Sequence, residues 1–304
     1  MATSDRQVVD QLPEDAGASA EAIRAHYDVG NDFYRLWLDH TMTYSSAMWR
    51  GPDDPASLQE AQQQKIDWHL RHSGADKAAR LLDVGCGWGS MLRAAVRQRA
   101  PGAANVERAV GLTLSDAQAE LGRRLAAAAQ APQIEIRIES WADHRPAMPY
   151  GALISVGAFE HFTKPDDDAA TKIAIYRGFF ERCHEMLETG AHMTLQTIAY
   201  GDPDDKTPTG PLIHDVFPES ELPRLPEILA ASNGLFEVER MRNDRTDYGR
   251  TCELWAASLK ARKAEAVAMV GKDQTRRYER YLKFAAWGFW SHRLHLLRFR
   301  LKRR

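Results

Sequence analysis

Short apolar runs alternate with amphipathic segments through the middle of the chain. Between the runs lie segments with helical periodicity, at 91–98, 116–129 and 170–187. Strands that alternate with helices indicate βαβ units, and such units build a parallel sheet. The runs that predict strands are LLDV at 81–84, AVGLTL at 109–114, IEIRI at 134–138, ALISVGAF at 152–159 and HMTLQTI at 192–198.

The flanking segments have other patterns. The start of the chain is polar and interrupted by Pro13 and Gly17, which predicts disorder. Two more strands are expected between Phe236 and Leu259, and a helix from Lys272. The expected division is a disordered 1–20, a helical cap at 21–75, a core at 76–260 with a lid inserted at about 200–226, and a C-terminal helical segment at 261–304.

The segment 291–304 is basic although the whole chain has a formal net charge of −2. Its basic residues are Arg293, Arg298, Arg300, Lys302, Arg303 and Arg304, and it contains no acid. Helical spacing predicts an amphipathic helix through this tail. It could pack on the core, cover the acceptor pocket, join subunits of a homo-oligomer, or contact an anionic membrane or carrier protein. The apolar stripe is Trp287, Trp290, Leu294, Leu297 and Leu301.

Composition argues against several classes of protein. A nearly neutral chain is untypical of a dedicated DNA-binding protein, so no nucleic-acid partner is expected. Cys86, Cys183 and Cys252 are far apart and form no CxxC pair, which argues against a zinc site and a disulfide scaffold. No metal is expected at the acidic run 166–168, which reads as a solvated helix start. With no signal-like start or membrane-spanning run, we expect a cytoplasmic enzyme, at most peripheral to a membrane.

The run LLDVGCGWGS places three glycines directly after a buried strand. Gly85, Gly87 and Gly89 can adopt positive φ and let a ligand approach the backbone. Such turns serve NAD, FAD and S-adenosylmethionine (SAM) alike. The GxGxG spacing and Asp83 before the first glycine favour SAM, which has no pyrophosphate to place on a helix N-terminus. The alternative is that the glycines only form a tight turn.

Polar residues follow the second and third predicted strands, where a nucleoside would lie. Thr113, Ser115 and Gln118 come after the second strand, in place of the usual acid. Trp141 follows the third strand and is either an aromatic beside the adenine or a core tryptophan.

The fourth strand ends in GAFEHF, which places Glu160 and His161 at the carboxyl edge of the sheet. Open α/β sheets hold their chemistry at this edge. A carboxylate there is unfavourable unless it is paired, hydrogen-bonded or used.

Longer motifs along roughly 25–284 resemble the cyclopropane fatty acid synthase and mycolic acid methyltransferase family. They are, in order, HYDVGNDFY, TYSSAMW, LLDVGCGWGS, GLTLSDAQ, ISVGAFEHF, VFPESELP, YGRTCELW and YERYLKF. The resemblance implies an α/β fold: a Rossmann-like class I SAM-dependent methyltransferase with a seven-stranded, mostly parallel sheet. It also implies a helical N-terminal extension, a lid and a C-terminal helix. The residues that it implies for SAM are Tyr44, Ser45, Gly85, Gly87, Thr113, Gln118 and Trp141.

The resemblance also implies chemistry at the methyl acceptor. In the family, a methyl group passes from SAM to an alkene carbon of an acyl chain, and bound bicarbonate removes a proton to close a cyclopropane ring. Glu160 and Tyr248 match the family's glutamate and tyrosine at the bicarbonate site. Ser46 stands in place of the family's cysteine, and Gln196 in place of its histidine. Both replacements keep a polar group.

Two enzymatic functions stay open. The first is methyl transfer to a carbon of an unsaturated, lipid-like substrate, giving a cyclopropane or a methyl branch. The second is N-, O- or C-methylation of a smaller metabolite, with Glu160 or His161 as base or orienting group. The replacements at Ser46 and Gln196 keep the second open. The third hypothesis is a protein that binds SAM or lipid without catalysis. The intact glycine turn and Glu160 argue against it.

Overall fold

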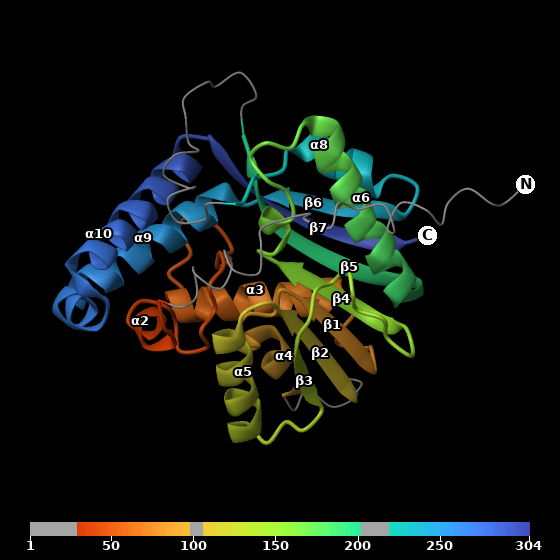
Figure 1. Ribbon diagram of the computed structural model, residues 1–304, viewed down its shortest axis with the longest axis horizontal. Helices are drawn as coiled ribbons and strands as arrows, with labels where there is room; N and C mark the ends of the chain where they lie inside the picture. The colour runs from red at the N-terminus through yellow and green to blue at the C-terminus, as the bar shows by residue number, and fades with distance from the viewer. Residues whose placement is uncertain (1–28, 98–105, 202–218) are drawn as a thin grey trace, which may run out of the picture.

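The computed structural model describes residues 29–97, 106–201 and 219–304. Seven strands form one sheet in the order β3-β2-β1-β4-β5-β7-β6 (Figure 1). The first five strands along the chain run parallel, and β7 pairs antiparallel with both β5 and β6. The expected seven-stranded, mostly parallel sheet is confirmed. The strands are β1 Arg80–Val84, β2 Arg108–Thr113, β3 Ile134–Ile138, β4 Tyr150–Val156, β5 Leu187–Tyr200, β6 Phe236–Asn243 and β7 Leu294–Arg303.

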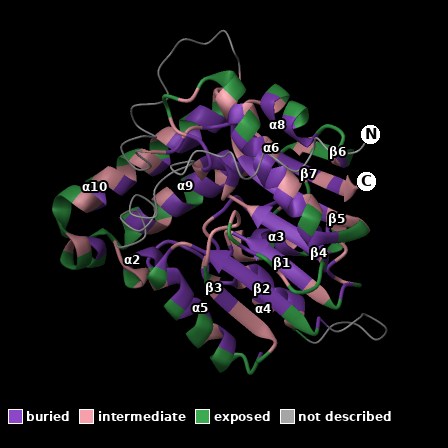
Figure 2. Ribbon diagram, turned by 45° about the vertical axis from the view of Figure 1, so that its right-hand side comes forward, coloured by how far each residue is buried: buried purple, intermediate pink, exposed green. Residues whose placement is uncertain are grey.

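Helices cover both faces of the sheet. Successive strand residues alternate between the faces, so Leu81 of β1 joins the core on one side and Leu82 the core on the other. Figure 2 shows the strands of β1 and β2 buried between these layers. The helices are α2 Asn31–Arg35, α3 Leu58–His72, α4 Ser90–Val96, α5 Asp116–Ala128, the short 3₁₀ turn η2 Phe159–His161, α6 Ala169–Met186, α8 Leu225–Ser232, α9 Arg245–Ala261 and α10 Lys263–Trp290.

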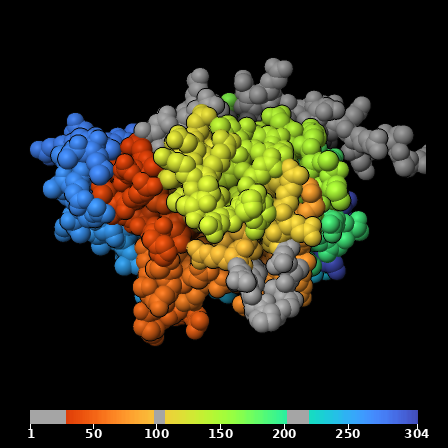
Figure 3. All heavy atoms as spheres, turned by 90° about the horizontal axis from the view of Figure 1, so that it is seen from below, coloured from red at the N-terminus to blue at the C-terminus, as the bar shows by residue number. Residues whose placement is uncertain are grey.

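A third group of helices lies beside the sheet. Helices α9 and α10 pack against each other and extend from the β6–β7 side (Figure 1). Figure 3 shows α2 between α10 and α5, and contacts on both sides agree with this. The Tyr34 hydroxyl of α2 lies 2.9 Å from the Tyr278 hydroxyl of α10. Helix α2 thus connects the helical pair to α5. None of the helices described here combines the length and the apolar character that crossing a bilayer requires.

The basic tail corrects one expectation. The C-terminal helix α10 ends at Trp290, and the tail then forms β7, a strand with a neighbour on each side. Leu297 and Leu301 fit both a helical and an alternating pattern. Phe299, between them, shows that the period is two, with basic residues at the positions between. Trp287 and Trp290 are 42% and 43% exposed and do not continue a buried stripe.

The segment after β6 differs from the expected second strand between Phe236 and Leu259. Instead of a second strand, residues 245–261 form helix α9. Tyr248, Cys252, Trp255 and Leu259 are buried along it at helical spacing, and this face packs on α2 and α10. The acidic run at 166–168 does begin a helix, because Asp168 caps α6 by accepting from the Thr171 amide at 2.8 Å.

Several expectations fall on undescribed residues. The disordered 1–20, the start of the helical cap at 21–28 and most of the expected lid, 202–218, lie outside the described ranges. The domain limits remain predictions.

Helix α3 carries polar residues on its buried face. Gln62, Lys65 and His69 recur at intervals of three and four residues and are each at most 1% exposed. The helix begins with a capping box, in which Ser57 and Glu60 bond to each other's backbone amides. The three polar side chains reach residues near the carboxyl edge of the sheet: Gln62 and Lys65 bond to Ser45, and His69 lies 3.4 Å from the Gln196 Oε1.

Candidate active site

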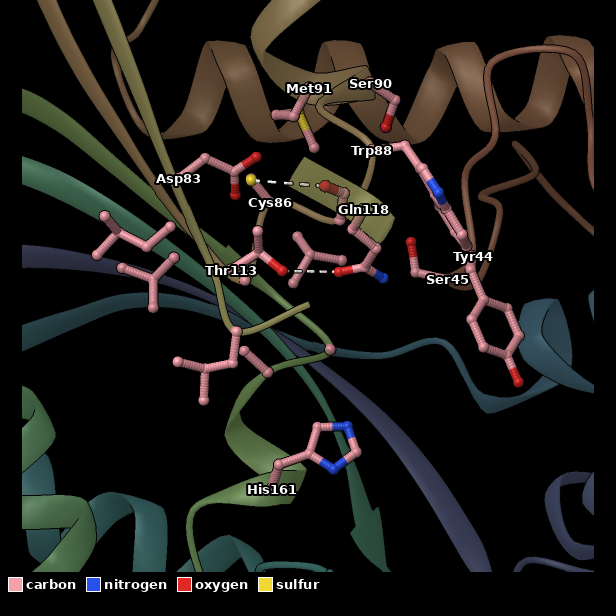
Figure 4. Close-up of a pocket in the computed structure, with 18 of the residues that line it drawn as sticks. Tyr44, Ser45, Asp83, Cys86, Trp88, Ser90, Met91, Thr113, Gln118 and His161 are labelled. Carbon is pink, nitrogen blue, oxygen red and sulfur yellow. Dashed lines mark hydrogen bonds between the residues drawn. The ribbon is translucent and has the colours of Figure 1, made fainter. Parts of the chain in front are cut away.

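A cavity opens at the carboxyl ends of β1, β2 and β4 (Figure 4). Most residues expected to bind SAM line it, from segments far apart in the chain. Figure 4 shows Tyr44, Ser45, Thr113 and Gln118 around the space, with His161 toward its far end. The expected residues that line it are Tyr44, Ser45, Asp83, Gly85, Gly87, Thr113, Gln118 and Trp141. Gly89 and Ser115 do not line it; they begin helices α4 and α5.

The first two glycines of the turn serve different purposes. At Gly85, with φ 78°, an added Cβ would lie 2.5 Å from the Ala158 Cβ, so this glycine permits close packing. At Gly87, with φ 54°, an added Cβ would meet nothing nearer than the Gln118 Nε2, 4.0 Å away. A side chain at Gly87 would therefore project into the cavity. The tight-turn explanation holds for Gly85, whereas Gly87 leaves space for a ligand.

The residues after β2 form a small hydrogen-bonded unit. Ser115 caps α5 by accepting from the Gln118 amide at 3.2 Å. The Thr113 hydroxyl donates to the Gln118 Oε1 at 2.8 Å. The Gln118 side-chain nitrogen is thereby left to donate into the cavity, where a nucleoside's hydroxyl groups can accept.

Lys65 lines the same cavity and was missed in the sequence. It is 1% exposed, and its Nζ donates to the Ser45 Oγ at 2.9 Å. Burial lowers the pKa of Lys65 to about 7, and burial raises the pKa of Asp83 to about 7. The sequence did contain one indication of it: Lys65 lies on the apolar stripe of a predicted helix, where a buried cation is unfavourable unless it is paired or binds a ligand.

Two features of this cavity complement SAM: an open glycine backbone and a pair of oppositely charged side chains. Gly87 leaves its backbone open to a ligand. Lys65 and Asp83 are a buried cation and a buried carboxylate on the wall, and the methionyl end of SAM carries a carboxylate and an ammonium. Opposite charges brought together in a water-poor site attract strongly.

A second cavity adjoins the first. Tyr44, Ser45, Gly157 and His161 line both, so they mark the junction. Beyond the junction, most walls are apolar and aromatic side chains from the end of β5, the segment before α8, helices α9 and α10, and the start of β7. These are Ile198, Leu222, Tyr248, Cys252, Tyr281, Ala285, Phe289 and Leu294. A ligand reacting at the junction would extend into a mostly apolar cavity.

Glu160 and Gln196 bring polar groups to this second cavity. Glu160 lies in η2 and is 6% exposed; its Oε1 accepts from the Ile198 amide at 2.6 Å. Its Oε2 is buried and has no hydrogen-bond partner among the described residues. Burial raises the pKa of Glu160 to about 7, so it exchanges a proton near neutrality.

The other acceptor candidates differ in place. His161 Nδ1 lies 2.7 Å from the Ser220 Oγ, and burial lowers the pKa of His161 to about 4, which keeps the ring neutral at pH 7. Tyr248 lines the second cavity and stacks on Phe289, with ring centres 4.5 Å apart. Ser46 lines neither cavity; it is fully buried, and its hydroxyl donates to the Ala47 carbonyl at 2.9 Å.

Comparisons with known proteins give one consistent picture. A family model described as mycolic acid cyclopropane synthetase matches residues 15–299, so the similarity continues into β7, beyond the motifs at 25–284. Cyclopropane mycolic acid synthase 2 of Mycobacterium bovis is 34% identical over 277 residues, which is 86% of this chain and 88% of that protein.

Two solved structures are similar over nearly the whole chain. Mycolic acid cyclopropane synthase CmaA1 complexed with SAH and CTAB has a TM-score of 0.82 and 32% identity, covering 94% of this chain and 99% of its own. The cyclopropane synthase MmaA2 from Mycobacterium tuberculosis has a TM-score of 0.83 and 30% identity, covering 95% and 100%.

Proposed function

Because the chain belongs to the mycolic acid cyclopropane synthetase family and is a SAM-dependent methyltransferase, we propose that it methylates a double-bond carbon of an unsaturated, lipid-like chain. A proton is then lost from the added methyl group in the second cavity, which Glu160 lines, and this loss closes a cyclopropane ring. The observation that carries this proposal is the junction of the two cavities at Tyr44, Ser45, Gly157 and His161. One cavity fits SAM and the other is apolar.

Four residues of the first cavity would each hold a different part of SAM. Lys65 would pair with the SAM carboxylate, Asp83 with its ammonium, and Gln118 would donate to the ribose. Gly87 would allow close approach to the glycine turn. Bound SAM supplies an electrophilic methyl group on a sulfonium, and its transfer needs alignment rather than a metal.

At the acceptor end, the residues must tolerate positive charge on the alkyl chain after methyl transfer. Glu160 supplies a carboxylate, and the faces of Tyr248 and Phe289 supply aromatic electron density in a water-poor cavity. The new C–C bond uses the alkene electron pair. Loss of a proton from the added methyl group returns an electron pair and forms the second bond of the ring.

Bicarbonate complements the polar groups of this cavity. The Glu160 Oε2 accepts a hydrogen bond, and Gln196 and Tyr248 carry donors. Bicarbonate has one O–H group to donate and oxygens that accept, so these residues would hold it. Held there, it would supply the base for the proton. Ser46 takes no part in this assignment because it lines neither cavity.

A smaller polar acceptor fits the second cavity less well. Its walls are mostly apolar, and His161, the other candidate base, is a weak base because burial lowers its pKa to about 4; its ring is also bonded to Ser220. CTAB, a long-chain detergent, accompanies SAH in the similar structure of CmaA1. A long apolar acceptor is consistent with both facts.

The test is transfer of labelled methyl from SAM. The protein is incubated with vesicles whose phospholipids carry cis-monounsaturated chains, with saturated vesicles as the control and a panel of amines and phenols as competing acceptors. Mass spectrometry should place the label in the unsaturated chains alone. Label found only in an amine or a phenol would overturn the proposal.

A further inference from the structure

Arg298 lies in β7, and its side chain is fully buried. It contacts Gln196, which lines the second cavity; this cavity is proposed to hold the acceptor chain and is called the acceptor cavity below. Its Nε donates to the Gln196 Oε1 at 2.8 Å, and its Nη2 donates to the Ala47 carbonyl at 2.9 Å. Its Nη1 donates to Asp244. All three nitrogens are therefore engaged, and Arg298 itself lines neither cavity. Asp244 and, at 3.7 Å, Asp247 balance its charge, and among its hydrogen-bond partners in the described ranges only Gln196 lines the second cavity.

Arg298 and His69 both donate to the same atom of the Gln196 carboxamide, which fixes whether its oxygen or its nitrogen faces the acceptor cavity. A guanidinium has only donors, so the atom 2.8 Å from Arg298 Nε must be the oxygen. The Nε2 of His69 lies 3.4 Å from the same oxygen, and the His69 Nδ1 lies 2.9 Å from the Thr194 Oγ1. Burial lowers the pKa of His69 well below its ordinary value, so a neutral ring donates from Nε2 and accepts at Nδ1.

The other end of the carboxamide is left for the cavity. No hydrogen bond within the described ranges engages the Gln196 Nε2, and Gln196 lines the acceptor cavity together with Glu160. The cavity therefore presents one fixed donor and one open carboxylate acceptor. A carboxamide has two orientations of similar intrinsic energy, so the donor is fixed only while something holds the oxygen.

We propose that Arg298 is a positioning residue for the proton transfer that closes the ring: it holds the Gln196 amide nitrogen toward the acceptor cavity, which Glu160 also lines. The inference rests on the proposed function for the use of that donor, which is to hold the oxyanion that takes up the proton. Without Arg298 only the longer contact with the His69 Nε2, at 3.4 Å, holds the oxygen, so the carboxamide can turn over. The cavity would then present two acceptors, Gln196 Oε1 and Glu160, and an oxyanion would be repelled.

The kinetic test is a double-mutant cycle in the full chain, using the unsaturated vesicles. Arg298→Lys keeps the charge beside Asp244 but loses the directed Nε bond, and should lower kcat about tenfold with SAM affinity unchanged. In a Gln196→Ala background, the same change should cost less than about twofold. A purely structural role predicts equal losses in both backgrounds, and that result would overturn the inference.

Arg242→Lys is the matched control. Arg242 also bonds to Asp244, with its Nη2 2.9 Å from Oδ1, and in the described part of the chain it makes no hydrogen bond with Gln196. Its kcat should stay at the wild-type value. If Arg298→Lys does not fold, Arg298→Gln combined with Asp244→Asn removes both charges and should give the same tenfold loss.

A second readout does not depend on any acceptor. With glutamine side chains labelled with ¹⁵N, the resonance pair absent from Gln196→Ala identifies the Gln196 amide. It should be sharp and slowly exchanging in wild type and in Arg242→Lys, and shifted or broadened in Arg298→Lys. An unchanged pair in Arg298→Lys would overturn the inference. If wild type methylates no unsaturated chain, the proposed function fails, and this spectrum still decides the role of Arg298.

Discussion

Replacing Lys65 by Met should weaken SAM binding and remove a proton from the binding reaction. The Lys65 ammonium is fully buried and faces Asp39, Asp83, Arg298 and the Ser45 hydroxyl. A charged hydrogen bond to the SAM carboxylate is worth about 1.5–3 kcal/mol, so its loss should raise Kd about 10- to 150-fold.

The proton follows from the pKa. Burial holds the pKa of Lys65 at about 7 in the free protein, and a carboxylate beside it favours the charged form. Above pH 7 the free protein has lost this proton and the complex has kept it, so binding takes one up. The affinity should fall about tenfold per pH unit above 7 until the pKa of the complex is reached. Asp83, with a pKa raised to about 7, must lose its proton to pair with the ammonium, so affinity should also fall below pH 7.

Calorimetric titration with SAM at about pH 8, in two buffers of different ionisation enthalpy, measures this proton. Wild type should take up about 0.9 proton more than Lys65→Met, because the proton exchange of Asp83 and of the SAM ammonium is common to both proteins. Lys172→Met is the matched control, because Lys172 is a buried lysine that bonds to the Leu222 carbonyl at 3.1 Å, away from the cofactor cavity. Equal uptake by wild type and Lys65→Met would refute the assignment of the carboxylate to Lys65.

Further changes test other parts of the account. Gly87→Val should abolish SAM binding because the side chain fills the cavity, and an unchanged affinity by titration would contradict this. Glu160→Gln should lower turnover about 100-fold with SAM affinity kept within about twofold; equal losses of both would mark Glu160 as a cofactor ligand. Wild-type turnover should rise through about pH 7 as Glu160 ionises, and a profile flat there would argue against it. Phe299→Ala should reduce the free energy of unfolding by about 3–5 kcal/mol in urea, because Phe299 is fully buried in β7; a loss under about 1 kcal/mol would contradict the core position of this strand.

The parallel half of the sheet could be predicted because each strand is a short apolar run that ends in distinctive residues. Asp83 lies near the end of β1 and the glycines follow that strand, and Glu160 follows β4, so the carboxyl edge was visible in the sequence. Strand β7 could not be predicted in this way, because Leu297 and Leu301 fit both the helical period and the alternating period of a strand. Which period holds depends on whether two strands, β5 and β6, are there to pair with it.

Lys65 and Arg298 were missed for a related reason. Each is a cation in an apolar pattern, and its partners come from distant segments: Ser45 for Lys65, and Gln196 and Asp244 for Arg298. Gln196 and Arg298 meet because they are paired across β5 and β7. That register is a property of the folded sheet, and local sequence patterns do not contain it.

The most direct test of the proposed reaction uses SAM whose transferred methyl group carries three deuterium atoms. The acceptor is the unsaturated phospholipid vesicle, and the product chain is analysed by mass spectrometry. Ring closure removes one hydrogen from the added methyl group, so the account predicts chains that retain two of the three deuterium atoms and have lost the double bond. A product that keeps all three, on carbon, nitrogen or oxygen, would contradict cyclopropane formation.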